Sequence, residues 1–391
     1  MSLVAKAHGI DGTMVEPDWP PLRLDEVRLL LKEFSDRLAP LRLLSVSPRP
    51  FSAASLVETR SENIFIKRHH RAVRDREGLL EEHGFIAHLR KHGAPVPRVI
   101  DAYSGLTAIE QGDWTYEVHE SPDGMDLYQE AISWTPFRSE THARSAGRML
   151  AKLHLASQGY AATARKVQPL VASFSIFAAQ DPTTEMARYL DERPVLGRDP
   201  ETRAHCARAL ELLAPFHDEL KPLLPALTPL WTHNDLHGSN LFWSNETDQA
   251  EAVAAIDFGL ADRTNAVHDL AHAIERSVVE WLALVQNPSR PEQARAHLDH
   301  LEALLEGYEQ VRTLSAQEAA ALAPMTALCH AEFALTEADY FLGVLHSRAK
   351  TEMATEGYLV SHALWFRSAV GRRLLDAIRR WADAHRMASV Q

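Results

Sequence analysis

The chain has few cysteines, no long apolar run and no surplus of basic residues. Its two cysteines, Cys206 and Cys329, lie far apart in the sequence, which excludes a disulfide framework and a cysteine-rich metal site. No apolar run reaches the ~18 residues that a membrane-spanning helix needs. The first residues also lack the apolar core of a secretory signal. These absences predict a cytoplasmic protein without a membrane segment.

The charge balance excludes another class of partner. The net charge is −12, from 41 Lys and Arg against 53 Asp and Glu. Nucleic-acid phosphates require clustered cations, and the one dense basic stretch, residues 67–76, is short and contains Asp75. No nucleic-acid partner is therefore expected. A chain of 391 residues that is 46% apolar has material for two domains, or for two lobes around a cleft.

The hydrophobic pattern divides the chain into three parts. Residues 1–22 contain glycine, aspartate and prolines and are expected to form a poorly ordered arm. Residues 23–118 combine two helical stretches with short strands, including a hairpin that turns at 111–113. Residues 119–391 are mostly helical, apart from a polar stretch between short apolar runs. This order predicts an α+β fold with a small antiparallel sheet lobe and a larger helical lobe.

The polar stretch "WTHNDLHGSNLFW" (231–243) holds the residues best suited to chemistry. Mg²⁺ prefers carboxylate and amide oxygens, so Asn240 and Asp257, which ends the next apolar run, are candidate metal ligands. Asp235 is the candidate catalytic residue. A carboxylate is a weak base toward an alcohol, so it would orient an acceptor hydroxyl and take its proton late.

Two residues upstream complete a set suited to phosphoryl transfer, which depends on positioning and on neutralising phosphate charge. Lys67 lies on a predicted strand and can bind phosphate oxygens as a point charge. Glu82, on the following predicted helix, can hold that lysine in place. ATP and Mg²⁺ are therefore the expected cofactors.

The order of these residues resembles the protein-kinase-like superfamily, and more closely its aminoglycoside phosphotransferase and choline kinase branch. "HNDLHGSN" is similar to that branch's "HGDLHPGN", and "IDFGLADRTNAVHDLA" (256–271) resembles its "IDFGDAGWGDPAYDLA". The resemblance covers about residues 40–380 and implies a two-lobed, protein-kinase-like fold. The residues that carry it are Lys67, Glu82, His233, Asp235, Asn240, Asp257, Phe258 and Gly259.

This resemblance implies ATP- and Mg²⁺-dependent phosphorylation of a hydroxyl. Only eleven positions separate Asp257 from His268, which leaves little chain for binding a peptide. We therefore expect a small acceptor, such as an aminoglycoside, choline or another amino alcohol, homoserine, or a methylthio-sugar. His233 and Asp269 are expected to support the catalytic loop rather than react.

The same resemblance places a nucleotide-binding hinge at Val118, His119 and Glu120, which would bind adenine through backbone groups. It places the acceptor between the catalytic loop and the C-terminal helices. The candidate acceptor-binding residues there are Glu332, Asp339, Tyr340 and Trp365.

The chain also departs from the pattern. Residues 47–59 contain no glycine where protein kinases have a glycine-rich loop, which leaves a nucleotide-binding pseudokinase as an alternative. A Ser/Thr protein kinase of the same fold is a second alternative. The third alternative is a metal-dependent hydrolase, which would use His233, Asp235, His237, Asp257 and His268. The identity of the acceptor, the choice between ATP and GTP and the oligomeric state stay open.

Overall fold

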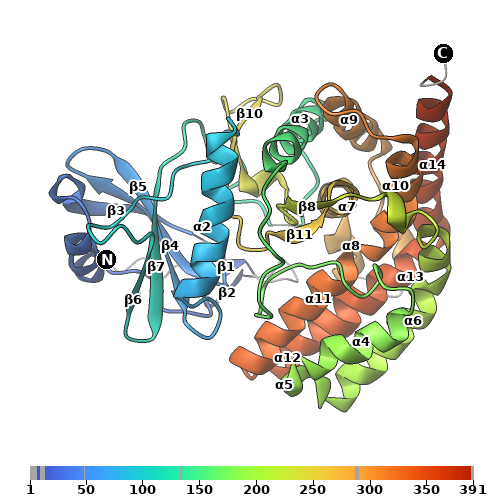
Figure 1. Ribbon diagram of the computed structural model, residues 1–391, viewed down its shortest axis with the longest axis horizontal. Helices are drawn as coiled ribbons and strands as arrows, with labels where there is room; N and C mark the ends of the chain where they lie inside the picture. The colour runs from blue at the N-terminus through green and yellow to red at the C-terminus, as the bar shows by residue number, and fades with distance from the viewer. Residues whose placement is uncertain (1–6, 9–13, 48, 133, 287–289, 389–391) are drawn as a thin grey trace.

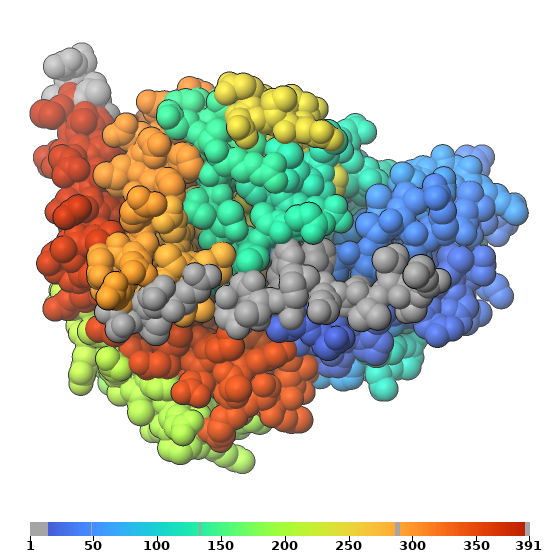
Figure 2. Space-filling model, turned by 180° about the vertical axis from the view of Figure 1, so that it is seen from behind, coloured from blue at the N-terminus to red at the C-terminus, as the bar shows by residue number. Residues whose placement is uncertain are grey.

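The computed structural model describes residues 7–8, 14–47, 49–132, 134–286 and 290–388. A small lobe built on a sheet lies beside a much larger helical lobe, with helix α2 between them (Figure 1). Seen from behind, the sheet lobe forms one end of the molecule and the C-terminal helix lies at the other (Figure 2). None of the helices in the described ranges is both long enough and apolar enough to cross a membrane.

The sheet of the small lobe has five antiparallel strands in the order β3-β4-β5-β7-β6. On β5 the side chains of Ile64 and Ile66 are buried on one face, and Phe65 and Lys67 point to the other. The register places Lys67 directly opposite Glu117 of β7. The strands are β3 (Pro40–Val46), β4 (Ala53–Thr59), β5 (Asn63–His70), β6 (Ala108–Gln111) and β7 (Trp114–Glu120).

The two faces of this sheet differ in chemistry. Helix α1 (Leu24–Leu30) runs directly into a 3-10 turn (Leu31–Glu33), and it packs into an apolar core on the Ile64 and Ile66 face. Helix α2 (Arg76–Lys91) covers the other face. It buries Phe85 in the core of the helical lobe, and the Phe85 ring centroid lies 5.3 Å from that of Trp231. Helix α2 therefore joins the two lobes.

The N-terminal arm, predicted over residues 1–22 as poorly ordered, packs against both lobes from residue 14 onward. The Trp19 ring stacks on His70 of the sheet lobe at 4.7 Å. Next to it, the Asp18 carboxylate accepts a hydrogen bond of 3.0 Å from the Tyr340 hydroxyl of the helical lobe. The expectation of poor order is wrong for this segment, and residues 1–6 and 9–13 lie outside the described residues.

The helical lobe is organised around one large apolar core. The first helix of this lobe is α3 (Glu140–Ser157). The remaining helices of the lobe are α4 (Pro182–Asp191), α5 (Pro194–Gly197), α6 (Pro200–Leu220), α7 (Ala266–Val278), α8 (Trp281–Gln286), α9 (Leu298–Glu309), α10 (Ala316–Leu328), α11 (His330–Asp339), α12 (Arg348–Glu352), α13 (Ser361–Arg367) and α14 (Ala369–Ala388), with π-helical turns at Tyr340–Val344 and Met353–Val360.

Two small antiparallel pairs interrupt the helices, and the apolar runs around the polar stretch predict only the pair of β9 with β10. Strand β8 (Pro229–Thr232) pairs with β11 (Asp262–Asn265). Strand β9 (Leu241–Trp243) pairs with β10 (Ala252–Ala255). The polar stretch predicted to carry the chemistry therefore connects β8 to β9, held at each end by a strand of a different pair.

Helices α3 and α9 approach so closely that glycine is required at their contact. An added Cβ at Gly307 would lie 1.9 Å from the Arg144 carbonyl oxygen, and one at Gly147 would lie 2.1 Å from the Leu304 carbonyl oxygen. Both obstacles are backbone atoms, which cannot rotate away. The two helices can therefore stay at this distance only while both positions lack a side chain.

We predict that Gly307→Ala lowers the free energy of unfolding by about 1–3 kcal/mol, because the methyl group forces the two helices apart. Urea unfolding measures the change. The matched control is Gly357→Ala, where an added Cβ meets nothing within 4 Å and stability should stay within about 1 kcal/mol of wild type. Equal effects of the two substitutions would contradict the close helix contact.

Candidate active site

One buried carboxylate, that of Asp269, fixes the backbone of the loop between β8 and β9. Asp269 of α7 accepts hydrogen bonds from the backbone N–H groups of His233, at 2.9 Å, and Asn234, at 2.7 Å. The His154 imidazole of α3 lies 3.0 Å from the same carboxylate. Asn234 has a φ of 62°, a left-handed conformation that asparagine tolerates better than most residues. The loop conformation therefore depends on Asp269.

The His233 ring fastens the loop to the strand end beside it. Its Nε2 lies 2.9 Å from the Ile256 carbonyl oxygen, and its Nδ1 lies 3.2 Å from the Asp235 backbone N–H. The ring must therefore carry its proton on Nε2 and accept through Nδ1. With both nitrogens engaged, His233 has the supporting geometry that the sequence predicts.

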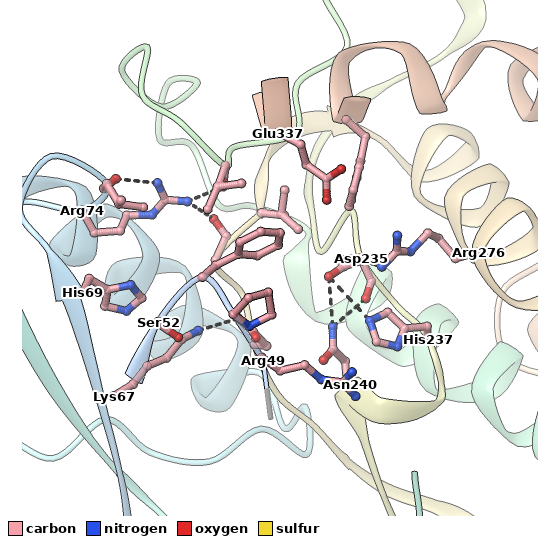
Figure 3. A pocket seen from close by; sticks show the side chains of 18 of the residues that line it. Arg49, Ser52, Lys67, His69, Arg74, Asp235, His237, Asn240, Arg276 and Glu337 are labelled. Carbon is pink, nitrogen blue, oxygen red and sulfur yellow. Dashed lines mark hydrogen bonds and ion pairs between the residues drawn. The ribbon is translucent and has the colours of Figure 1, made fainter. Parts of the chain in front are cut away.

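The Asp235 side chain lies between a cation and two neutral groups (Figure 3). Its Oδ1 is 3.0 Å from an Arg276 guanidinium nitrogen, and its Oδ2 is 3.7 Å from His237 Nε2. The Asn240 amide donates to the Asp235 carbonyl and to Oδ2, at 2.9 and 3.2 Å. Burial alone would raise the pKa of Asp235, but Arg276 and His237 outweigh burial and lower it. Asp235 is therefore ionised at neutral pH.

A second charged pair joins the two lobes across the cleft. The Lys67 ammonium donates to Asp257 Oδ1 at 2.8 Å. Burial disfavours both charges, yet each partner stabilises the other, so the pKa of Lys67 is raised and the pKa of Asp257 is lowered to about 2. Asp257 has a φ of 60°, which is rare outside glycine and is typical of strained functional positions.

The residues around this pair suit a divalent cation. Asn240 and Asp257 line the same cleft. The amide nitrogen of Asn240 is committed to Asp235, which leaves its amide oxygen as the group that can bind a cation. One carboxylate and one amide oxygen are ligands that Mg²⁺ accepts while it keeps several waters. The donor set thus fits the predicted metal.

Glu82 lines the cleft, but Lys67 forms its ion pair with Asp257 instead. Glu82 Oε2 is buried, has no hydrogen-bond partner among the described residues, and lies 3.9 Å from an Arg165 nitrogen. Its negative charge still helps to raise the pKa of Lys67. The predicted Lys67–Glu82 contact is therefore wrong for this conformation, and a positioning role for Glu82 stays a prediction.

The three hinge residues lie at the end of β7 and differ in orientation. His119 and Glu120 line the cleft. Val118 is buried in the apolar core of the sheet lobe, and its carbonyl accepts a hydrogen bond of 2.7 Å from the Ile100 N–H. Backbone contacts to adenine are therefore obstructed at the Val118 carbonyl and at the Glu120 N–H, which donates to the Arg98 carbonyl at 2.9 Å. They stay a prediction for the other backbone groups of His119 and Glu120.

The glycine-free turn between β3 and β4 is held down by the helical lobe. The Phe51 ring contacts Tyr340 and Phe341 at centroid distances of 5.3 and 6.0 Å. The Arg49 guanidinium donates to the Ala131 carbonyl at 3.1 Å. Side-chain contacts with the other lobe thus hold this turn over the cleft, where protein kinases rely on glycine-rich backbone.

Asp235 lines a second cavity, which shares Lys67, Asn240 and Asp257 with the cleft (Figure 3). The Arg276 guanidinium lies over the rings of Trp134 and Phe333, 4.1 and 4.7 Å from their centroids. The Glu337 carboxyl points into the cavity from α11, only 4% exposed, and its Oε2 has no hydrogen-bond partner among the described residues. Burial raises the pKa of Glu337 to about 8, although Arg276 partly offsets burial.

The four residues predicted to bind the acceptor do not line this cavity. The Glu332 carboxylate accepts from the backbone N–H groups of Ser175 and Ile176, so it holds a loop in place. Asp339 lies 3.8 Å from Arg193. The other two are buried: the Tyr340 hydroxyl donates to Asp18, and the Trp365 indole donates to the Ala294 carbonyl at 2.9 Å.

The sequence reading missed Arg276, Glu337 and Trp134. Helical spacing offered one signal, because Arg276 lies seven residues after Asp269 and thus on the same face of α7. Glu337 lies between Glu332 and Asp339, and only the rotation of α11 decides which of these acids faces Asp235. Trp134 lies in the connection between β7 and α3, where no periodicity applies.

We predict that Glu337→Gln removes a pH dependence of stability. The folded chain holds this proton up to about pH 8, so the stabilisation is complete below the usual carboxyl pKa of 4.5 and is lost as the pH rises toward 8. Relative to the variant, the wild-type free energy of unfolding should fall by at most about 1.4 kcal/mol per pH unit across this window. Urea unfolding over a pH series measures this, and parallel curves would contradict it.

Comparison with solved structures places the fold among kinases. The microcompartment-associated aminopropanol kinase superposes with a TM-score of 0.56 at 21% identity, over 91% of this chain and 98% of that one. The amicoumacin kinase hAmiN, solved with AMP-PNP and Ca²⁺, gives 0.52 at 14% identity over 87% and 97%. The spectinomycin phosphotransferase APH(9)-Ia, solved with ADP and spectinomycin, gives 0.52 at 14% identity over 88% and 98%.

A search of curated proteins finds no sequence match. The model of the phosphotransferase enzyme family (APH) matches residues 48–314, more than half of the chain. This match and the superpositions confirm the family resemblance and the two-lobed, protein-kinase-like α+β fold. The chain belongs to the phosphotransferase enzyme family, and it is a phosphotransferase with an alcohol group as acceptor.

Proposed function

We propose that this chain transfers the terminal phosphoryl group of Mg·ATP to a hydroxyl of a small molecule. The observation that carries the proposal is the position of Asp235. This ionised carboxylate lines one cavity together with the Lys67–Asp257 pair and Glu337, and Lys67 and Asp257 also line the nucleotide cleft. A hydroxyl bound in the cavity can therefore reach both Asp235 and a nucleotide in the cleft.

Each charged residue has a role in this transfer. Asp235 accepts a hydrogen bond from the acceptor hydroxyl and directs its oxygen at the terminal phosphorus. Because its pKa is lowered, Asp235 takes the proton only as the new O–P bond forms and the bond to the leaving ADP oxygen breaks. Lys67 binds phosphate oxygens, while Asn240 and Asp257 hold the metal. Mg²⁺ would supply neutralisation of phosphate charge.

Binding of the nucleotide requires the Lys67–Asp257 pair to separate. The ammonium then pairs with phosphate, and the carboxylate pairs with the cation, so each charge keeps an opposite partner. Glu82 is buried close to Lys67, which makes it the carboxylate available to hold the amine after this exchange. AMP-PNP and Ca²⁺ in the amicoumacin kinase support a nucleotide and a divalent cation for the fold.

Glu337 supports an acceptor that carries an amino group as well as a hydroxyl. A buried carboxyl without a partner is costly when ionised, and an ammonium group would supply the missing charge. Trp134 and Phe333 line the same cavity, with the Arg276 guanidinium over both rings. Aminoglycosides, amino alcohols such as choline, and homoserine all carry such a nitrogen. The names of the aminopropanol and spectinomycin kinases agree with this class.

The hydrolase alternative has less support. In the part of the chain that the structure describes, two groups of His, Cys, Asp or Glu could hold a metal, and neither includes His233, Asp235 or Asp257. Both nitrogens of His233 are bonded within the loop. The pseudokinase alternative conflicts with the presence of all four charged or amide groups that phosphoryl transfer needs. These are Lys67, Asp235, Asn240 and Asp257.

We predict that Asp235→Asn lowers acceptor-dependent ADP release by about 10²–10⁴-fold, because the amide cannot take the hydroxyl proton. A screen of hydroxylated amines with Mg²⁺ and ATP measures turnover, and a thermal shift with Mg·ATP checks that nucleotide binding survives. The matched control is Asp339→Asn, whose carboxylate lies outside the cavity; its turnover should be unchanged. Normal turnover in the Asp235 variant would overturn the mechanism.

For the acceptor, we predict that Glu337→Gln raises the KM of an amino-bearing acceptor at least about tenfold, because a bound ammonium group stabilises the ionised Glu337 carboxylate and the amide cannot carry that charge. The KM for ATP should not change, since Glu337 does not line the nucleotide cleft. Steady-state kinetics on paired acceptors that differ only in the amino group measure whether the rise in KM depends on that group. A similar loss for both acceptors would argue against an ammonium on Glu337.

A further inference from the structure

A group of imidazoles surrounds one carboxylate in the layer between the sheet and helix α2. Glu117 of β7 is buried at its centre. His69 Nε2 lies 2.9 Å from Glu117 Oε1, while His83 Nε2 and His119 Nε2 lie 2.9 and 2.7 Å from Oε2. Nothing in the proposed phosphoryl transfer requires these three histidines.

The elements themselves bring the four side chains together. Glu117 and His119 are two residues apart on β7, so they share a face of the sheet. His69 points to the same face from β5, because it is two residues beyond Lys67, which pairs with Glu117. His83 comes from α2, which covers this face. A convergence from three separate elements is a built site rather than a feature of one helix or turn.

The second nitrogen of His83 has a partner that suits a metal ligand. Its Nδ1 lies 2.8 Å from the Thr107 hydroxyl oxygen. A hydroxyl can donate or accept, so the ring can move its proton to Nδ1 and turn the Nε2 lone pair toward an ion. Such an outer hydrogen bond orients metal-ligating histidines in proteins.

We propose that His83, Glu117 and His119 bind a transition-metal ion, with Zn²⁺ the best fit. The three ligand atoms lie within 4.8 Å of one another. Neutral imidazoles and a carboxylate favour Zn²⁺ over Mg²⁺, which prefers oxygen ligands. Bonds of about 2.0–2.1 Å in a tetrahedron separate ligand atoms by about 3.3 Å, so the side chains need to open by about half an ångström.

The ion would have an entry route and a consequence. The His119 side chain is 14% exposed, and His119 and Glu117 line the nucleotide cleft together with Lys67. An ion can therefore enter from the cleft before nucleotide binds. Once bound, it neutralises the Glu117 carboxylate, which is one of the charges that raise the pKa of Lys67. The metal would thus stabilise the sheet lobe and weaken the electrostatic attraction of Glu117 for Lys67, the phosphate-binding lysine.

The test uses the full-length chain, freed of metal with a chelator and titrated with Co²⁺, whose visible absorption reports tetrahedral nitrogen and oxygen ligands. Excess Mg²⁺ is present throughout to occupy the oxygen ligands Asn240 and Asp257. We expect absorption bands that saturate at a single ion per chain, and a higher Tm with Zn²⁺. His83→Asn and His119→Asn should each abolish both signals.

The matched control is His300→Asn. His300 belongs to the other candidate group, with His297 and Asp299, which is partly exposed on the helical lobe. This variant should keep the bands and the Tm rise. Far-UV circular dichroism and a cooperative urea transition verify that the site variants fold, and His119, the most exposed of the three histidines around Glu117, is the mildest change.

Three outcomes would overturn the proposal: no saturable bands in the wild type, bands that persist in both site variants, or bands lost in His300→Asn. In each case the histidines serve only as hydrogen-bond donors to a buried Glu117. None of these measurements depends on turnover, so failure here leaves the proposed phosphotransferase reaction untouched.

Discussion

The geometry of the candidate active site depends on a single buried carboxylate, that of Asp269. It binds two successive backbone N–H groups of the catalytic loop, which no side chain of the loop could do for itself. Seven residues further along α7, the Arg276 guanidinium pairs with the Asp235 carboxylate. The same helix therefore sets both the path of the loop and the charge state of its central aspartate. A buried ion without these partners would be strongly unfavourable, so loop and helix must form together.

Two kinds of contact join the two lobes, one apolar and one between charged side chains. Helix α2 presents Phe85 to the core of the helical lobe and polar residues to the sheet. Across the cleft, the ion pair between Lys67 and Asp257 joins β5 to the segment that follows β10. The apolar contact is permanent, whereas the ion pair can exchange its partners for phosphate and a cation. This division lets the cleft respond to ligand without loss of the interface, since only the charged contact has to change.

Much of the fold could be predicted because its signals are local. Alternation on β5 and helical spacing over α2 and α3 follow directly from side-chain periodicity. The arm was misjudged because its order comes from contacts without a local pattern: Asp18 contacts Tyr340 of the helical lobe, and Trp19 stacks on His70 of the sheet lobe. The acceptor side chains were misjudged for a related reason. Composition shows that α11 carries acids, but its rotation against the core decides that Glu337 faces Asp235.

The sequence by itself predicted the candidate catalytic set and its order, because His233-x-Asp235, Asn240 and Asp257 lie close together in the chain and their spacing reflects one loop and one strand end. Tertiary structure alone decided the partners of these groups. Lys67 binds Asp257 instead of Glu82, and Arg276 reaches Asp235, because charges separated by long stretches of chain find partners only when the lobes pack. Tertiary structure likewise decided the position of the histidines around Glu117, because they come from three separate elements that have no shared sequence pattern.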